Sequence, residues 1–195
     1  MDAQHLTARI LLASYTNGCF PMPDSKNPKI IDFYRPDPRA IIPLDEFHVS
    51  RSMKRELNRT DLRTAFNTAF TSVMKACAER PDTWITEDFI RAYGELHELG
   101  FAHSVEIYIG EKLAGGVYGV AIGAAFFAES MFHKESNMSK LALYRLVGQL
   151  RLKGFELLEC QFLTPHLQSL GAQTVPDEKY MDMLNQALER DLSFI

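Results

Sequence analysis

The 195-residue sequence has few of the residues that cross-link a chain or hold a metal. It contains three cysteines, Cys19, Cys77 and Cys160, so any disulfide scheme leaves one of them unpaired. No two cysteines have a metal-ligand spacing such as C-x-x-C, and the six histidines form no H-E-x-x-H motif. These absences argue against a disulfide framework or a structural zinc, and we expect no metal and no other cofactor.

Long apolar runs and a surplus of positive charge are also missing. No run of about 18 apolar residues occurs, so we expect no membrane-spanning segment. The first residues, MDAQHLTARI, place an acid and polar groups where a secretory signal has basic and apolar segments, which favours a cytoplasmic protein. The formal net charge of −4 argues against a generally basic nucleic-acid coat protein, because phosphate binding draws on concentrated lysine and arginine. A local basic patch remains compatible with it.

The composition that is present is typical of a globular chain, with 46% hydrophobic and 24% charged residues. Its character changes near residue 40. Residues 1–49 comprise a short helix at 3–16 and an irregular arm rich in proline, and each proline removes a backbone donor and favours extended geometry. We therefore expect this arm to pack on a main domain formed by residues 50–195.

Helix-starting residues recur through the main domain. A residue able to cap a helix stands at five places: Ser50, Asn67, Thr86, Asn137 and Thr164. Glycines predict helix ends at Gly100 and Gly154, and a last helix begins at Asp177.

Period-two patterns predict three consecutive strands at residues 102–109, 113–122 and 124–132, with further strands at 155–161 and 173–175. This order predicts an α+β fold, a sheet with helices packed on it. It also matches the order of the N-acetyltransferase-like fold, although order alone does not fix that choice.

One carboxylate lies in an unusually apolar strand. On a regular strand Phe127, Glu129 and Met131 share one face, so Glu129 stands between two large apolar groups. A buried charge without a partner is costly. Glu129 is therefore either paired with a lysine or arginine at a sheet edge, or placed in an apolar cleft that receives a cation or an amine.

A second polar pair lies on the strand predicted at 155–161. Glu159 and Gln161 project to one side, with Leu158 and Cys160 on the other. Such a face either meets solvent or lines a site. The amide of Gln161 cannot act as a base but can orient an amine or donate to a developing oxyanion, whereas Glu159 could accept a proton.

Two further features have both a structural and a functional interpretation. Residues 51–63 hold five cations against two acids, which suits either a solvated helix face or a phosphate-binding stripe. Trp84, the only tryptophan, is either a core residue or a stacking partner for a base, a contact worth about 1–3 kcal/mol.

Ordered motifs along nearly the whole chain resemble the bacterial leucyl/phenylalanyl-tRNA–protein transferase family. The motifs are GCFP (18–21), RPDPRA (35–40), SRSMKR (50–55), TWIT (83–86), LHELG (96–100), AHSVE (102–106), GGVYGV (115–120), ESMF (129–132), NMSK (137–140) and SLGA (169–172). The resemblance implies an N-acetyltransferase-like main domain in which aminoacyl-tRNA replaces acyl-CoA. It also implies transfer of Leu or Phe, with Met a plausible third, to proteins whose N-terminus is Arg or Lys, which marks them for degradation.

The resemblance also implies roles for particular residues. Three match polar residues at the reaction centre: Glu129, Glu159 and Gln161. Five fall where the family builds its pocket for the transferred side chain: Met131, Leu143, Leu146, Leu150 and Leu158. Trp84 matches an aromatic residue that packs on the terminal adenosine of the tRNA. Arg51 and Arg55 match the cluster that holds the acceptor stem.

The sequence departs from the family pattern at several positions. Glu159 stands where relatives commonly have Asp, and Thr164 replaces a nearby Asn or Asp. Met22 occupies the place of a second adenosine-stacking Trp, with Phe20 close by. Two alternatives remain at this stage: an acyl-CoA-dependent N-acyltransferase of the same fold, and a non-catalytic tRNA-binding module.

Overall fold

The computed structural model describes residues 6–24, 27, 30–81 and 83–195. The expected first helix is α1 (Ala8–Thr16), which begins after Thr7, and residues 3–5 of that prediction lie outside the described residues. None of the helices in these ranges combines the length and apolarity that crossing a bilayer requires.

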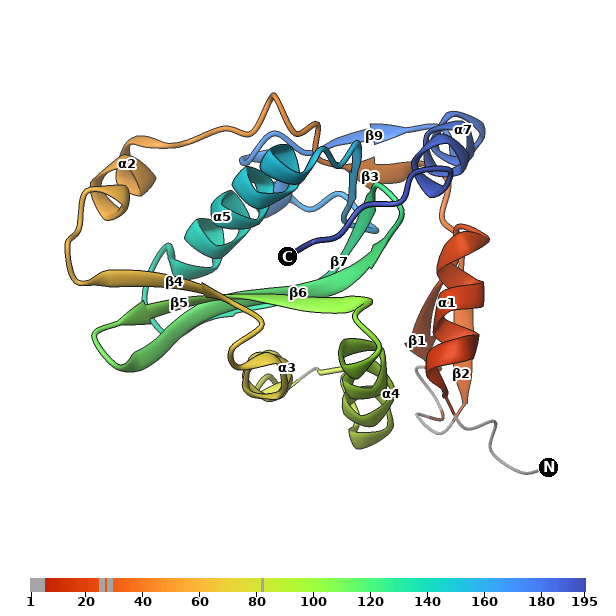
Figure 1. Cartoon of the computed structure of the whole chain (residues 1–195), viewed down its shortest axis with the longest axis horizontal. Coiled ribbons are helices and arrows are strands. Elements are labelled where there is room, and N and C mark those ends of the chain that lie inside the picture. The colour runs from red at the N-terminus through yellow and green to blue at the C-terminus, as the bar shows by residue number, and fades with distance from the viewer. Residues whose placement is uncertain (1–5, 25–26, 28–29, 82) are drawn as a thin grey trace.

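A seven-stranded sheet forms the centre of the molecule (Figure 1). Its strands, in spatial order, are β4 (Leu62–Phe66), β5 (Ala102–Ile109), β6 (Lys112–Ile122), β7 (Ala125–His133), β8 (Leu157–Glu159), β3 (Arg39–Ile41) and β9 (Gln173–Val175). Every neighbouring pair is antiparallel except β7 and β8, which are parallel. The α+β class expected from the sequence is confirmed by this sheet and its helices.

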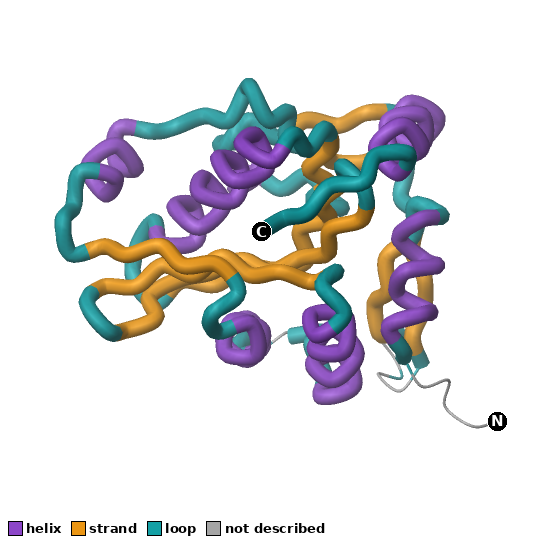
Figure 2. The backbone as a smooth tube through the Cα atoms, viewed as in Figure 1, coloured by secondary structure: helices purple, strands orange, loops and turns teal. Residues whose placement is uncertain are grey.

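Helices cover both faces of the sheet, as Figure 2 shows. On one face lie α1, α3 (Phe70–Ala78), α4 (Glu87–Glu98) and α7 (Asp177–Leu188), whose apolar residues join one core cluster. On the other face α5 (Met138–Lys153) is the main cover, with α2 (Arg51–Leu57) beside it and the short α6 (Pro165–Gln168) nearby. Because side chains alternate along a strand, β6 and β7 supply residues to both clusters.

The C-terminal residues close the second core. The chain end runs between α5 and the sheet (Figure 1), and Phe194 is almost completely buried there. Its ring lies against those of Phe126 and His103, and its carbonyl accepts a hydrogen bond from the Gln149 side chain at 2.6 Å.

Most predicted element boundaries agree with the structure, because local capping determines them. Ser50 accepts the amide of Met53 at 3.3 Å to begin α2, and Thr164 accepts that of Leu167 at 3.2 Å to begin α6. Asn137 and Gly154 flank α5 as expected. The strand at 102–109, the strand at 173–175 and the helix beginning at Asp177 match β5, β9 and α7.

The prediction that Asn67 caps α3 was wrong. Ala69 is the N-cap residue, and the carboxylate that accepts the amides of Thr68 (3.4 Å) and Ala69 (3.3 Å) belongs to Glu106 on β5. Asn67 instead has a positive φ of 59° and accepts the Ser104 amide at its side-chain oxygen. The helix start is therefore satisfied by a residue distant in sequence.

The proline-rich arm is more regular than expected. β1 (Phe20–Pro23) and β2 (Ile31–Tyr34) form a separate two-stranded antiparallel sheet, in which prolines are tolerated because both strands are edges. β3 then enters the main sheet between β8 and β9. The described part of residues 1–49 thus contributes a strand to the main sheet as well as packing on it.

Candidate active site

A β-bulge in β7 places the Glu129 side chain. Tyr118 of β6 pairs with Ser130 and the next residue, Gly119, pairs with Ala128, so Glu129 is the extra residue between them. The bulge reverses the alternation of side chains beyond it. Phe127 belongs to the core shared by α1, α3, α4 and α7, where its ring lies against that of Tyr15, whereas Met131 packs in the core beneath α5. The expectation that both share one face with Glu129 was therefore wrong, because it assumed an uninterrupted period of two.

The Glu129 carboxyl group is buried and held by two donors. It is 7% exposed, accepts the Tyr93 hydroxyl at 3.1 Å on Oε2, and accepts the Gln161 side-chain amide at 3.1 Å on Oε1. The Tyr93 hydroxyl in turn shares a short hydrogen bond with that of Tyr15 on α1. Burial, and to a lesser extent the negative charge of Glu159, raises the pKa of Glu129 to about 8.

Glu129 is not an edge residue paired with a cation. β7 lies between β6 and β8 inside the sheet, and no ion pair among the described residues includes Glu129. A buried carboxyl group with a pKa near neutrality is typical of sites that transfer protons or bind amines. This geometry favours the interpretation of Glu129 as a carboxylate in an apolar cleft.

Gln161 reaches Glu129 because the chain turns sharply after β8. The strand expected at 155–161 contains only Leu157–Glu159, and Gln161 has a left-handed backbone with φ of 65°. Such a conformation is unfavourable for a residue other than glycine, and it persists where surrounding contacts enforce it, often at functional sites. Here the Gln161 amide donates to Glu159 Oε1 at 2.5 Å and its carbonyl accepts the amide of Ala40 at 3.2 Å.

Glu159, two residues before Gln161, forms a fully buried ion pair with Arg39. Its Oε1 accepts Arg39 Nε at 2.8 Å, and both side chains are completely buried. Burial raises the pKa of Glu159, and the positive charge of Arg39 opposes that shift. Glu159 has no exposed surface and therefore offers no atom to the solvent-accessible site. Its contacts are those of a residue that holds others in place.

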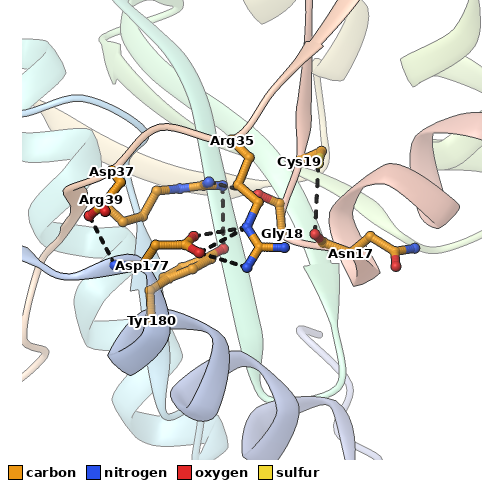
Figure 3. Close-up of polar contacts among 8 residues, drawn as sticks. All are labelled: Asn17, Gly18, Cys19, Arg35, Asp37, Arg39, Asp177 and Tyr180. Atoms are coloured by element: carbon orange, nitrogen blue, oxygen red, sulfur yellow. Dashed lines mark hydrogen bonds and ion pairs between the residues drawn. The ribbon is translucent and has the colours of Figure 1, made fainter.

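Arg39 is a site residue that the sequence analysis did not single out. Besides Glu159, it donates to the Gly18 carbonyl at 2.7 Å and the Tyr180 hydroxyl at 3.4 Å (Figure 3). Its guanidinium also lies over the rings of Tyr180 and Phe20. No local pattern reveals this, because β3 has only three residues, too few to show an alternating pattern. Tyr15 and Tyr93 were also missed, because the sequence pattern of each helix is that of an aromatic residue in the core.

A small cavity opens where β7 and β8 diverge beyond their paired residues. It has a volume of about 80 Å³ and is lined by Val117, Ala128, Glu129, Ser130, Met131, Leu143, Cys160 and Leu167. Of the five residues expected to form the side-chain pocket, Met131 and Leu143 line this cavity. Leu146, Leu150 and Leu158 lie buried in the adjoining core. A larger hollow of about 570 Å³ near the start of β8 includes neither Glu129 nor Gln161 in its lining.

The aromatic residues expected to bind adenosine occupy different environments. Trp84 is half-buried with its ring edge-on to Phe89, and Met22 is half-buried against the same core. Phe20 is completely buried and offers no open ring face here. Two aromatic residues that contact Phe20 are instead exposed, Tyr34 at 40% and Phe162 at 46%, and sequence analysis did not identify them.

Four of the five cations in the basic segment at residues 51–63 are exposed, and Arg59 is half-buried. Arg59 pairs with Glu56 and Asp61, and Arg63 lies over the Tyr108 ring at 4.0 Å. The remaining cations are Arg51, Lys54 and Arg55 on α2, all exposed and without an ion-pair partner among the described residues. Within the described ranges no cluster of three or more histidines, cysteines and acids is suited to a metal ion.

The fold and the site define a class of protein. The sheet opens between two parallel strands beside an apolar cavity lined by the Glu129 carboxyl group, to which the Gln161 amide donates, and this arrangement suits an enzyme that aligns two substrates for group transfer. The model of the family described as leucyl/phenylalanyl-tRNA protein transferase matches residues 41–185, and the chain belongs to that family.

Curated relatives extend this match to nearly the full length. The chain is 49% identical over 189 residues to the leucyl/phenylalanyl-tRNA–protein transferase of Cereibacter sphaeroides (strain KD131), covering 97% of this chain and 88% of that one. It is 48% identical over 188 residues to the protein of the same description from Akkermansia muciniphila, covering 94% and 97%. The resemblance drawn from the motifs is therefore confirmed.

Solved structures of low sequence identity are also similar to this chain. A GCN5-related N-acetyltransferase from Kribbella flavida matches with a TM-score of 0.45 and 11% identity, covering 71% of this chain and 55% of that one. The structure of L-PGS from Bacillus licheniformis matches with a TM-score of 0.48 and 9% identity, covering 80% and 66%.

Proposed function

We propose that this protein transfers Leu or Phe from aminoacyl-tRNA to the α-amine of proteins whose N-terminal residue is Arg or Lys, marking them for degradation in the cytoplasm. Family membership supports an aminoacyl-tRNA donor and a protein acceptor. The observation that carries the proposal is the contact between Gln161 and Glu129 at the edge of an apolar cavity.

The proposed reaction makes one bond and breaks one. The nitrogen of the acceptor amine attacks the ester carbonyl carbon, the new C–N bond forms, and the C–O bond to the tRNA ribose breaks. The amine loses a proton and the departing ribose oxygen gains one. Because the ester is already activated, the transfer needs no nucleotide and no covalent enzyme intermediate. Alignment of the two substrates can supply several kcal/mol.

The roles of the polar residues follow from their chemistry. With a pKa of about 8, Glu129 is partly ionised near neutral pH, and this ionised form is suited to take the proton from the attacking amine and to return it to the ribose oxygen. The Gln161 amide can orient the amine or steady the oxyanion that forms on the ester. Glu159 holds the backbone of Gln161 through the hydrogen bond from its amide.

The pocket and the tRNA contacts complete the proposal. Met131 and Leu143 line the cavity that would receive the amino-acid side chain, and Leu146, Leu150 and Leu158 form the core behind it. An apolar pocket separates residues that differ by one methylene by only about 1–3 kcal/mol, so Met is expected as a third, weaker substrate.

Arg51 and Arg55 offer an exposed cationic face for the acceptor stem. Trp84 and Met22, both half-buried, are proposed to pack against the terminal adenosine. Phe20, enclosed in the core cluster against which both residues pack, is proposed to support that contact.

A labelling panel tests the proposal. Purified protein is incubated without added nucleotide with tRNAs charged individually with Leu, Phe, Met or Val, and with peptides that begin with Arg, Lys, Asp or Glu. We expect label from Leu and Phe on the Arg and Lys peptides, weaker label from Met, and none from Val. Absence of label from every charged tRNA would reject the transfer activity, and label only on the Asp or Glu peptides would reject the proposed acceptor.

A further inference from the structure

We propose that Arg39 is a positioning residue for the transfer reaction: acting through Glu159, it holds the left-handed turn that aims the Gln161 amide at Glu129. This inference rests on the proposed function for its kinetic test. It also has a spectroscopic test that does not depend on transfer activity.

The contacts of Arg39 join three parts of the fold at one buried guanidinium. Nη1 binds the Gly18 carbonyl in the turn between α1 and β1, Nη2 lies 3.4 Å from the Tyr180 hydroxyl on α7, and Nε binds Glu159 at the end of β8. The side chain is completely buried. Every branch of the guanidinium therefore has a partner on a different element, as Figure 3 shows for Gly18 and Tyr180.

The connection from Arg39 to the reacting groups passes through a single oxygen. Oε1 of Glu159 accepts both Arg39 Nε at 2.8 Å and the backbone amide of Gln161 at 2.5 Å. The other oxygen, Oε2, is buried without a hydrogen-bond partner in the described structure. The position of Oε1, and with it the turn at Gln161, consequently depends on Arg39.

A role in stability alone does not account for this pair. Replacing a buried ion pair by well-packed apolar residues is often neutral or stabilising, so a fully buried pair is weak evidence of a stabilising function. What a charge-assisted hydrogen bond does supply is short, directional geometry. Gln161 needs that geometry because its backbone is in a region that side chains other than glycine rarely adopt.

Arg35 provides a matched control four residues away. It also links the N-terminal segment to α7, through two hydrogen bonds of Nε and one of Nη2 to Asp177 (Figure 3). The Arg35 side chain is 42% exposed and makes no contact with Glu159. Replacing it removes the same kind of charge from the same region without disturbing the route to Gln161.

The kinetic test compares Arg39→Met with Arg35→Met in single turnover at saturating aminoacyl-tRNA and peptide. We expect the rate to fall about 100-fold for Arg39→Met, because misplacement of a reacting group by about 1 Å costs that much, with little change in the KM for aminoacyl-tRNA. Arg35→Met should retain the wild-type rate, since exposed pairs contribute little.

A double-mutant cycle then asks whether Arg39 acts through the Gln161 side chain. Adding Arg39→Met to Gln161→Ala should lower the rate much less than about 100-fold, because the group that Arg39 positions is already gone. An equal loss in both backgrounds would overturn the proposal, and so would a loss confined to KM. If Arg39→Met does not fold, Arg39→Lys is carried through the same cycle with the same criteria.

The spectroscopic test follows the backbone amide proton of Gln161 by NMR. In Arg39→Met or Arg39→Lys this resonance should move, because its acceptor oxygen has lost a partner, and in Arg35→Met it should stay in place. An unmoved Gln161 resonance in a folded Arg39 variant would overturn the proposal even if the protein transfers no amino acid. If the wild-type protein transfers no amino acid but the Gln161 resonance still moves in the Arg39 variants, only the proposed function is rejected.

Discussion

At the scale of single residues, the carboxyl group of Glu129 combines burial, two neutral donors and a raised pKa. Desolvation is the largest cause of that shift, and Glu159 adds a smaller electrostatic contribution. Between pH 4.5 and about 8, Glu129 is therefore mainly neutral in the folded protein, whereas it is mainly ionised in the unfolded chain.

Because the pKa of Glu129 differs between the folded and unfolded states, the free energy of unfolding should depend on pH. The substitution Glu129→Gln should remove this dependence. The folded protein retains a proton between the usual pKa of 4.5 and about 8, whereas the unfolded chain has lost it. Stability from this group is therefore fully present below pH 4.5 and is lost as the pH rises to about 8. Urea unfolding should show wild type losing several kcal/mol relative to Glu129→Gln over this range.

Well above pH 8, where Glu129 is ionised in both states, the difference between the two proteins should be constant. A difference that is flat from pH 4.5 to 8 would show that the pKa of Glu129 is not raised. Glu98→Gln, at the end of α4, serves as the control, because its carboxylate is exposed and has no ion-pair partner among the described residues.

The sequence predicted part of the site at this scale. Glu129 was recognisable because a carboxylate among Phe126, Phe127 and Met131 conflicts with its surroundings, and such conflicts often mark function. The bulge was not predictable, because it depends on how β6 pairs with β7. Arg39 was missed because its partners Gly18, Glu159 and Tyr180 are scattered along the chain.

At the scale of elements, β6 and β7 lie unusually close at Gly119. A Cβ atom there would lie 2.2 Å from the Phe127 carbonyl oxygen and 2.5 Å from the Phe126 ring. Gly119→Ala should therefore destabilise the protein by about 1–3 kcal/mol or more, since the carbonyl belongs to a paired strand and cannot easily move. Chemical denaturation measures this directly.

Gly148→Ala is the matched control, because a Cβ atom at this position of α5 meets nothing within 4 Å. It should stabilise the protein by about 0.5–1 kcal/mol, as alanine is preferred to glycine within a helix. Equal effects of the two substitutions would contradict the close approach at Gly119.

The exposed cations of α2 predict how aminoacyl-tRNA binding depends on salt. Replacing Arg51 and Arg55 together by alanine removes two proposed phosphate contacts. The slope of log affinity against log salt concentration should then become shallower by roughly 1.8, at about 0.9 for each contact. Lys75→Ala on α3, which also removes an exposed cation, should leave the slope unchanged. A slope that is insensitive to Arg51 and Arg55 would remove α2 from the tRNA-binding surface.

Elements with local signals were predicted well and elements without them were not. The caps at Ser50 and Thr164 and the alternation along β5 are readable because neighbours in sequence produce them. β3 and β4 were missed, since strands of three and five residues depend on their partners in the sheet. The cap of α3 was missed because Glu106 lies far along the chain.

At the scale of the whole molecule, the N-terminal segment is part of the main sheet. β3 pairs with β9 on one side and with β8 on the other. It also supplies Arg39, without which Glu159 would be a buried charge lacking its partner. Breaking such a pair by removing one member typically costs about 3–5 kcal/mol, a large part of the stability of a domain.

A truncated chain of residues 50–195 is therefore not expected to fold cooperatively. Urea unfolding followed by circular dichroism should give a broad transition or none, compared with a single sharp transition for the full chain. Adding back a peptide that spans residues 6–49 should restore part of the signal. A sharp, full-length-like transition of the truncated chain alone would show that the two segments are separable units.

The central claim is that the amide of Gln161, held against Glu129, promotes transfer of the amino acid from tRNA to an acceptor amine. The most direct measurement is the single-turnover rate of Gln161→Ala at saturating Leu- or Phe-tRNA and an Arg-started peptide, together with its affinity for the charged tRNA. Loss of one such donor should lower the rate by about 10²–10³-fold while the affinity stays at the wild-type value. A wild-type rate in this variant would contradict the account.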